Sequence, residues 1–215
     1  EQERLLHDLP GVFLVMPGDQ QNASRMFELA LRHGPAKLEL MGEGAAEALQ
    51  RIEEIRTLRE LEVHDEAIEE LPEGLFELKY LRSLTLCMRN LREIPAAIGR
   101  LRNLRSLVIS NVPLLGEGTA RSHKSPAGPK DWTPLPREQL SLTSLPPAIG
   151  ELVNLRGLSI IYTGIRELPD ELEKLKRLRS LNISGNLLTE TNPALLQRMP
   201  GLQEVYTSNE RILAW

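Results

Sequence analysis

The strongest constraint on the fold is a repeat of about 23 residues that runs through most of the chain. Each copy opens with an aliphatic residue followed three and five positions later by further aliphatics, and the clearest copies begin at Leu58, Leu81, Leu104, Leu155 and Leu178. A weaker copy begins at Pro35, and a last copy begins at Leu202. Several copies in fixed register indicate a repeat architecture, in which a unit buries its apolar side only by stacking on its neighbours.

The second half of each copy repeats as well. An aliphatic residue followed by proline recurs at Leu71-Pro72, Ile94-Pro95, Leu145-Pro146 and Leu168-Pro169. The alternating Leu-x-Leu segment predicts a short strand whose apolar side chains point inward, and the proline redirects the chain. Two more spaced aliphatics follow each proline and are expected to pack from the opposite side.

With these motifs, and with the stretch LRSLTLCMRNLREIPAAIGRL at 81–101 in particular, the sequence resembles the leucine-rich-repeat family over about residues 35–212. The resemblance implies an α/β solenoid, a right-handed superhelix with a parallel concave β-sheet and an N-terminal cap. The family's asparagine after each strand is kept only at Asn186, and its position otherwise holds Glu66, Arg89, Val112 and Thr163. Asn90 and Asn111 lie one position away and are candidates to replace it.

Residues 1–34 lie outside the repeat. The segment VFLVM at 12–16 predicts a strand and residues 23–32 predict a helix, so we interpret 1–34 as the N-terminal cap and 35–215 as about seven repeat copies. The copy that begins at Leu104 carries an insertion near 112–141, rich in Gly, Pro and Ser. A loop of this length is either a mobile excursion or a functional arm, here one anchored on a partner by Trp132.

Composition excludes several classes of protein. With 26 basic and 30 acidic residues the chain has no basic field, so nucleic acid is not an expected partner. No apolar run approaches the length of about 20 residues that spans a bilayer, and no signal peptide is visible. Cys87 is the single cysteine, so no disulfide forms within the chain, which favours an intracellular environment.

No catalytic constellation stands out from the sequence. His7, His33, His64 and His123 are scattered without a second metal ligand at a typical spacing along the chain. No phosphate-binding glycine motif is present. The sequence therefore predicts no enzymatic activity, no cofactor and no metal site.

The residues between and just after the strand aliphatics are expected on the concave face. The exposed apolar groups expected there are Cys87, Met88, Val108, Ile161 and Tyr162. There the first copies are acidic and the middle copies are small and nearly uncharged, which is how a protein-binding patch with a polar surround is built. The predicted partner-binding residues are Cys87, Met88, Val108, Ile161, Tyr162 and Tyr206, with Trp132 in the insertion. The alternative is that small side chains only avoid crowding on a curved sheet.

One position carries arginine in five successive copies: Arg59, Arg82, Arg105, Arg156 and Arg179. Stacked strands place such neighbours about 5 Å apart, so the column could dock an acidic partner. The alternative is a solvated face whose arginines pair with nearby glutamates.

The sequence thus predicts a non-catalytic module that recognises a protein partner through its concave face, monomeric in isolation. The repeat type resembles Ras-binding-type repeat proteins and the repeat domain of bacterial type III effectors. The second resemblance implies a host-target-recognition domain, acting in the cytoplasm or delivered into a host cell. The alternatives are an oligomerising or structural scaffold, and the substrate-selecting domain of a larger ubiquitin ligase.

Overall fold

A computed structural model describes residues 12–15, 20–41, 44–111, 140–188, 193–207 and 210–213 of the chain. Within these ranges nine strands form one sheet in the order of the sequence. They are β1 (Val12–Val15), β2 (Lys37–Met41), β3 (Glu60–Asp65), β4 (Ser83–Met88), β5 (Ser106–Ser110), β6 (Gly157–Ile161), β7 (Ser180–Asn182), β8 (Glu204–Thr207) and β9 (Glu210–Leu213). Nearly all of the insertion, with Trp132, lies outside the described residues.

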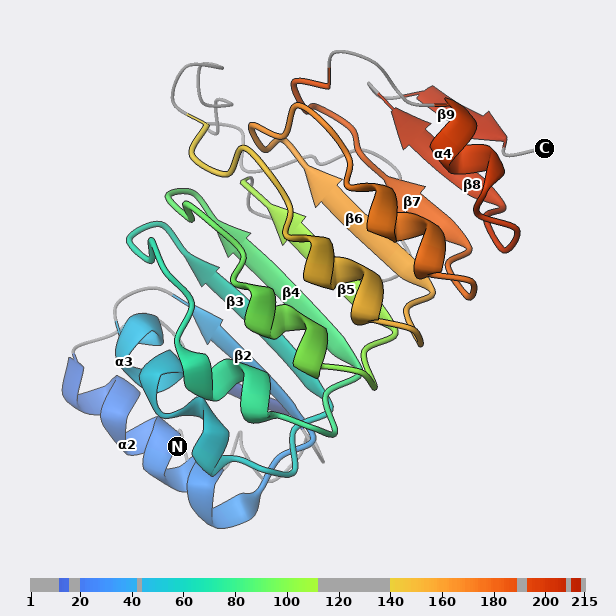
Figure 1. Cartoon of the computed structure of the whole chain (residues 1–215). Coiled ribbons are helices and arrows are strands. Elements are labelled where there is room, and N and C mark those ends of the chain that lie inside the picture. Colours follow the sequence, from blue (N-terminus) through green and yellow to red (C-terminus); the bar gives the residue numbers. More distant parts are fainter. Residues whose placement is uncertain are drawn as a thin grey trace.

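The sheet is parallel from β1 to β8, and β9 turns back antiparallel to β8. Figure 1 shows the strands side by side with the helices lying over one face of the sheet. This arrangement confirms the predicted α/β solenoid with a parallel sheet. It also places the strand of the predicted cap, β1, in the same sheet as the repeats.

The repeat period aligns the aliphatic side chains into continuous rows inside the solenoid. One row runs through neighbouring residues of seven strands, each at most 1% exposed: Leu38, Leu61, Leu84, Leu107, Leu158, Leu181 and Val205. Leu107 and Leu158 are direct register neighbours although the insertion separates them in the sequence. The stack of strands is therefore continuous between the copies on either side of the insertion, and the predicted interior row is confirmed.

Short helices cover the other side of the core. They are α2 (Gln20–His33), α3 (Ala45–Gln50), η1 (Ile52–Glu54), η2 (Glu73–Glu77), η3 (Ala96–Arg100), η5 (Pro147–Glu151), η6 (Asp170–Lys174) and α4 (Pro193–Gln197). In each repeat the extended proline of the aliphatic-Pro motif directly precedes a 3₁₀ helix. Proline suits this place because its fixed φ starts a helix and its missing N–H leaves no donor unpaired. The aliphatics that follow, such as Leu75 and Ile149, are fully buried, as predicted.

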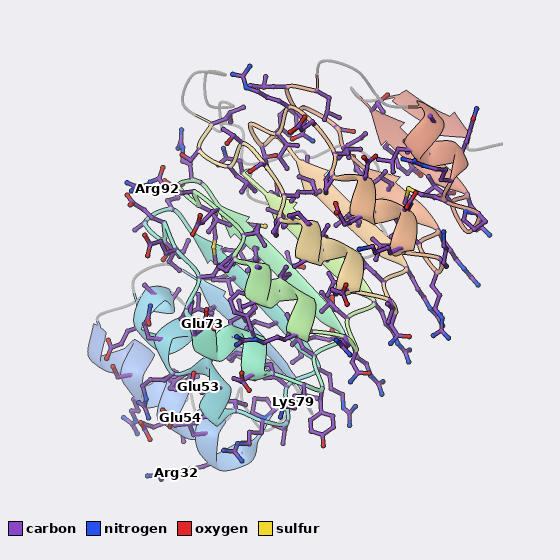
Figure 2. All side chains as sticks on the ribbon, viewed as in Figure 1. Arg32, Glu53, Glu54, Glu73, Lys79 and Arg92 are labelled. Atoms are coloured by element: carbon purple, nitrogen blue, oxygen red, sulfur yellow. The ribbon has the colours of Figure 1, made fainter. Side chains whose placement is uncertain are left out.

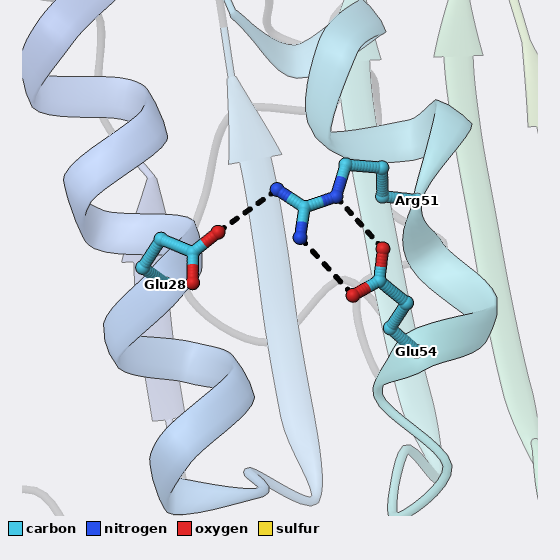
Figure 3. A network of polar contacts seen from close by, with 3 residues as sticks. All are labelled: Glu28, Arg51 and Glu54. Atoms are coloured by element: carbon cyan, nitrogen blue, oxygen red, sulfur yellow. Dashed lines mark hydrogen bonds and ion pairs between the residues drawn. The ribbon is translucent and has the colours of Figure 1, made fainter.

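The first helix is attached to the repeats by both packing and charge. Phe27 and Ala30 of α2 are buried in the common core. The Arg51 guanidinium donates to Glu28 of α2 at 2.9 Å and to both carboxylate oxygens of Glu54 at 2.7 and 3.1 Å, as Figure 3 shows. It also lies 5.2 Å from the centre of the Phe27 ring. The hydrogen bond with Arg51 lowers the pKa of the Glu54 carboxyl. These contacts support the reading of the N-terminal segment as a cap, whose boundary at residue 34 stays a prediction.

Ion pairs join successive copies outside the sheet, and Figure 2 labels Glu73 in η2 and Arg92 in the loop between β4 and η3. Arg100 of η3 contacts Glu73 at 3.0 Å and Glu77 at 3.4 Å, both in η2. Arg92 contacts Glu69 at 2.6 Å. Exposed pairs of this kind each contribute little to stability, so the buried aliphatic rows carry the fold.

None of the helices in the described ranges combines the length and the apolar character that crossing a membrane requires.

Candidate functional site on the strand face

The side of the sheet turned away from the aliphatic core is the candidate binding surface, which we call the strand face. Alternate residues of a strand point to opposite sides, so this face carries three rows of side chains that cross the sheet. The first row is Lys37, Glu60, Ser83, Ser106, Gly157, Ser180 and Glu204. The second row is Glu39, Glu62, Thr85, Val108, Ser159, Asn182 and Tyr206. The third row is Met41, His64, Cys87, Ser110 and Ile161.

The chemistry of the strand face changes along the solenoid. On β2 and β3 it is charged, whereas from β4 to β7 every residue of the three rows is uncharged. Five side chains in this central part are short and buried between their neighbours, namely Thr85, Cys87, Ser110, Ser159 and Asn182. At the far end the Tyr206 hydroxyl donates to the Glu204 carboxylate at 3.2 Å. The strand face therefore has an uncharged centre between two polar ends, as the sequence predicted.

Four of the predicted partner-binding residues lie on the strand face. Val108 and Ile161 are partly exposed apolar side chains in the uncharged centre, and Tyr206 is partly exposed at the C-terminal end. Cys87 lies in the same row as Ile161, separated from it by Ser110, but its side chain is buried. The expectation that Cys87 is exposed is therefore wrong, while its place in the row is as predicted.

Met88 does not lie on the strand face. It is the register neighbour of Asp65 and has the same parity along β4 as Leu84 and Leu86, so its side chain points into the core and is only 3% exposed. The prediction that Met88 is an exposed apolar group is wrong for this reason. Asp65, its neighbour, instead accepts hydrogen bonds from the amides of Ala67 and Ile68 at 2.6 and 2.9 Å and holds the turn after β3.

Tyr162 lies just beyond the end of β6, outside the three rows. It has a left-handed backbone conformation with φ of 52°, and its amide donates to the Ser184 carbonyl at 3.0 Å. Its ring packs on Gly185, where an added Cβ would lie 2.5 Å from the ring Cδ1. The half-buried ring thus stacks on the next copy, and a role for Tyr162 in binding a partner stays a prediction.

The asparagine positions explain how the turns after the strands are held. The Asn186 amide donates to the carbonyls of Ile160 and Ile183, each at 2.8 Å, and accepts from the backbone N–H and hydroxyl of Thr163 at 3.0 and 2.6 Å. Asn90 reaches the Glu66 carbonyl of the preceding copy at 2.7 Å, so it does bond across copies from its shifted position.

Asn111 differs from both of these residues. Its side-chain Oδ1 is buried and has no hydrogen-bonding partner in the part of the chain that the structure describes. The Asn111 oxygen therefore does not accept a hydrogen bond as the Asn186 oxygen does, and the expectation that Asn111 replaces the family's asparagine is not met for this atom.

The arginine column runs along the edge of the sheet where the strands begin. From Arg82 onward, each backbone N–H in the column donates to the carbonyl of the preceding arginine, at 2.6 Å from Arg82 to Arg59 and at 2.7–2.8 Å in the later steps. All five side chains are exposed, and among the described residues none of them forms an ion pair. The alternative that glutamates neutralise the column does not hold in the described part of the chain.

A cluster that the sequence reading missed lies on β2 and β3. His64 Nε2 is 3.8 Å from a carboxylate oxygen of Glu39 and 3.9 Å from one of Glu62. Lys37 Nζ is 2.9 Å from the other oxygen of Glu62. The sequence does contain a pattern that indicates this cluster. Glu39 and Glu62 occupy the same position in successive copies, and His64 follows on the same face of the strand. A search for ligand spacing along the chain does not detect a cluster that forms across two copies.

The electrostatics of this cluster favour ionised groups. Interactions with His64 and Lys37 outweigh burial and lower the pKa of Glu62 to about 2. Burial alone lowers the pKa of His64, but Cys87, Glu62 and Glu39 together raise it to about 10. The hydrogen bond with Glu62 raises the pKa of Lys37. At neutral pH the Glu62 carboxylate is thus a charged acceptor for any cation on this part of the strand face.

Comparison with known proteins gives structural neighbours only, since no family model and no curated protein sequence matches the chain. A leucine-rich-repeat protein of Leptospira interrogans aligns with a TM-score of 0.60 at 21% identity, over 96% of this chain and 45% of the other. The leucine-rich-repeat domain of the type III effector XopL aligns with a TM-score of 0.61 at 24% identity, over 88% of this chain and 58% of the other.

A chain of the Drosophila Toll–Spatzle complex aligns with a TM-score of 0.57 at 21% identity, over 92% of this chain and 23% of the other. In all three cases the present chain spans less than two thirds of the length of its neighbour. The neighbours and the 23-residue register agree on the architecture. The chain folds as a leucine-rich-repeat protein.

Proposed function

We propose that this chain is a protein-recognition module that binds a partner through the strand face and carries out no reaction. The observation that carries the proposal is the uncharged centre of the strand face between β4 and β7. Charged residues are depleted in the buried centre of protein interfaces, and polar residues form the rim. The charged residues of β2 and β3 and the Glu204–Tyr206 pair flank the centre as such a rim.

The shape of the centre supports contact with a partner's main chain or apolar side chains. The side chains there are short, so an approaching segment can come close to the sheet, and Val108 and Ile161 offer apolar surface. One continuous sheet over one core holds these residues in place. A surface that is ordered before binding loses little conformational entropy on association.

The arginine column adds a preference for the charge of the partner. Five exposed guanidinium groups, which form no ion pair within the described ranges, lie along one edge of the sheet, spaced by roughly the 4.8 Å between strands. Such a row attracts acidic groups and accelerates association at low salt. We therefore propose a protein partner with an apolar segment for the centre of the strand face and acidic residues facing the column.

Finer assignments rest on the sequence resemblance. We propose that the chain acts as the host-target-recognition domain of a bacterial effector, in the cytoplasm or after delivery into a host cell. As the substrate-selecting domain of a larger ubiquitin ligase it would use the same surface. An oligomerising scaffold would instead occupy this surface with copies of the chain, so a monomeric mass in solution supports recognition and a concentration-dependent larger mass supports the scaffold.

The test uses two valines that receive the same substitution on different parts of the molecule. Val108 lies in the uncharged centre, whereas Val153 lies in the turn between η5 and β6 and is 48% exposed. Peptides selected from a random displayed library on the unmodified chain are expected to bind Val153→Arg as before and to lose binding to Val108→Arg. Circular dichroism and melting curves confirm that both variants fold. Selected peptides that bind both variants equally well contradict the proposal.

A further inference from the structure

Three side chains that can bind a metal ion converge on the strand face of β2 and β3. The donor atoms of Glu39, Glu62 and His64 all lie within 4.8 Å of one another. Glu39 and Glu62 are register neighbours on adjacent parallel strands, so the sheet fixes their proximity. His64 lies two residues after Glu62 and on the same face.

The state of His64 is a second and independent sign of a ligand. Its side chain is only 10% exposed, yet neither ring nitrogen has a hydrogen-bonding partner among the described residues. A buried polar group without a partner is costly and rare in folded proteins. Its Nε2 faces the two carboxylates at 3.8 and 3.9 Å, which is too far for hydrogen bonds. The ring nitrogen therefore faces two anionic oxygens, and a zinc ion bound between these groups replaces the imidazole proton, which zinc binding releases.

The distances suit a small metal ion after a slight closure. Zinc binds imidazole nitrogen at about 2.0–2.1 Å and carboxylate oxygen at about 2.0–2.2 Å. Two ligand atoms at such distances are about 3.4 Å apart when the angle at the metal is tetrahedral. The separations of His64 Nε2 from the two carboxylate oxygens exceed this value by about half an ångström, and all three donor atoms lie within 4.8 Å of one another. Side-chain rotation of the two glutamates can close this gap without any movement of the strands.

We propose that Glu39, Glu62 and His64 bind one zinc ion on the strand face, with the remaining coordination position open to water or to a donor atom of a partner. An imidazole nitrogen suits zinc and related transition metals, whereas magnesium and calcium favour sets of oxygen ligands alone. The inference goes beyond partner recognition and does not require that a protein binds the uncharged centre.

Lys37 gives the site a resident competitor. Its ammonium group holds one oxygen of Glu62 at 2.9 Å and leaves the oxygen that faces His64 as the ligand. Removing this positive charge is expected to tighten zinc binding, since a nearby cation repels the metal. If Lys37 only stabilises the fold, its removal gives no gain in zinc affinity. The variant Lys37→Met therefore distinguishes competition with zinc from a purely structural role.

Zinc titration of the whole chain, stripped of metal with a chelator, tests the site by calorimetry and by competition with a chromophoric chelator. One zinc per chain is expected, with no competition from magnesium. His64→Ala and Glu39→Gln each weaken binding by about tenfold or more, the scale on which perturbed ligand shells lower metal affinity. Glu60→Gln is the matched control, because this exposed carboxylate lies on the same strand but outside the cluster, and it leaves the affinity within about twofold.

The alternative to be tested is that the Cys87 thiol binds zinc, because Cys87 is the register neighbour of His64 on β4. The proposed site keeps its zinc affinity in Cys87→Ser. Loss of binding in Cys87→Ser together with unchanged binding in Glu39→Gln overturns the proposal in favour of a thiol site. Absence of stoichiometric zinc binding, or binding that survives both His64→Ala and Glu39→Gln, also overturns it. Melting curves of the metal-free variants show that each one is folded.

Discussion

Replacing Gly150 with alanine measures how closely successive copies stack on the helix side. A Cβ at Gly150 in η5 would lie 2.5 Å from the carbonyl oxygen of Glu171 and 2.9 Å from its Cβ in η6. Ordinary contacts between such atoms are about 3.5–4.0 Å, so η6 must move away by about 1 Å. The atoms in the way belong to the backbone and to Cβ, so side-chain rotation alone cannot relieve the contact.

The expected loss follows from two opposing effects. Forcing an extra methyl group into a packed interior destabilises a protein by about 1–3 kcal/mol. Removing a glycine from the unfolded chain returns about 0.4–1 kcal/mol, and Gly150 does not need its freedom because its φ is not positive. We therefore expect Gly150→Ala to lower the free energy of unfolding by about 1–2 kcal/mol.

Gly157 is the matched control on the other side of the solenoid. A Cβ at Gly157 in β6 meets nothing within 4 Å, and its φ is not positive either. The same substitution there is expected to raise the free energy of unfolding by about 0.4–1 kcal/mol. Urea unfolding followed by circular dichroism compares the two variants, provided that the m-values agree. Equal stability of Gly150→Ala and Gly157→Ala would refute the close contact between η5 and η6.

Three further predictions concern the core, a turn and the cap. Leu107→Ala, in the centre of the interior row, lowers the free energy of unfolding by about 2–5 kcal/mol, measured by urea unfolding. Asn186→Ala costs about 1–3 kcal/mol because buried backbone groups lose their partner, and hydrogen exchange of the Thr163 amide becomes faster. Arg51→Met destabilises the chain slightly at pH 7. The difference in stability between Arg51→Met and the unmodified chain shrinks as the pH falls below about 4.5, because the Arg51–Glu54 contact adds stability only while the Glu54 carboxyl is ionised. Melting temperatures of both proteins, measured from pH 7 to below pH 4.5, test whether the difference shrinks.

The core could be predicted from the sequence because its residues follow both the two-residue alternation of the strands and the 23-residue spacing of the copies. Alternation within a strand decides which face a residue occupies, and the 23-residue spacing decides which residues become neighbours. Leu107 and Leu158 meet across the insertion because each keeps its phase within its own copy. The reversal at β9 could not be predicted, because an apolar pattern carries no information on strand direction.

The site was predicted less completely because its details depend on strand ends and on neighbouring copies. Met88 was assigned to the wrong face because the position after a strand was assumed to leave the alternation, whereas β4 continues through it. Tyr162 lies one residue beyond Ile161 of the third row and has a positive φ, which its residue type does not suggest. The cluster at His64 forms between copies, so it becomes visible only when the copies are written under one another in register.

The two proposed activities of the strand face can be tested separately because of the spacing between strands. Val108 lies in the same row as Glu62 but two strands away, with Thr85 between them. Two strand spacings amount to about 10 Å, which exceeds the screening length of about 8 Å at physiological ionic strength. Substitutions at such separations act nearly additively on free energies. A charge placed at Val108 should thus leave zinc affinity almost unchanged, and removal of the His64 imidazole should leave the uncharged centre intact. If one substitution abolished both activities, the cause would be a change in the whole sheet rather than the loss of either site.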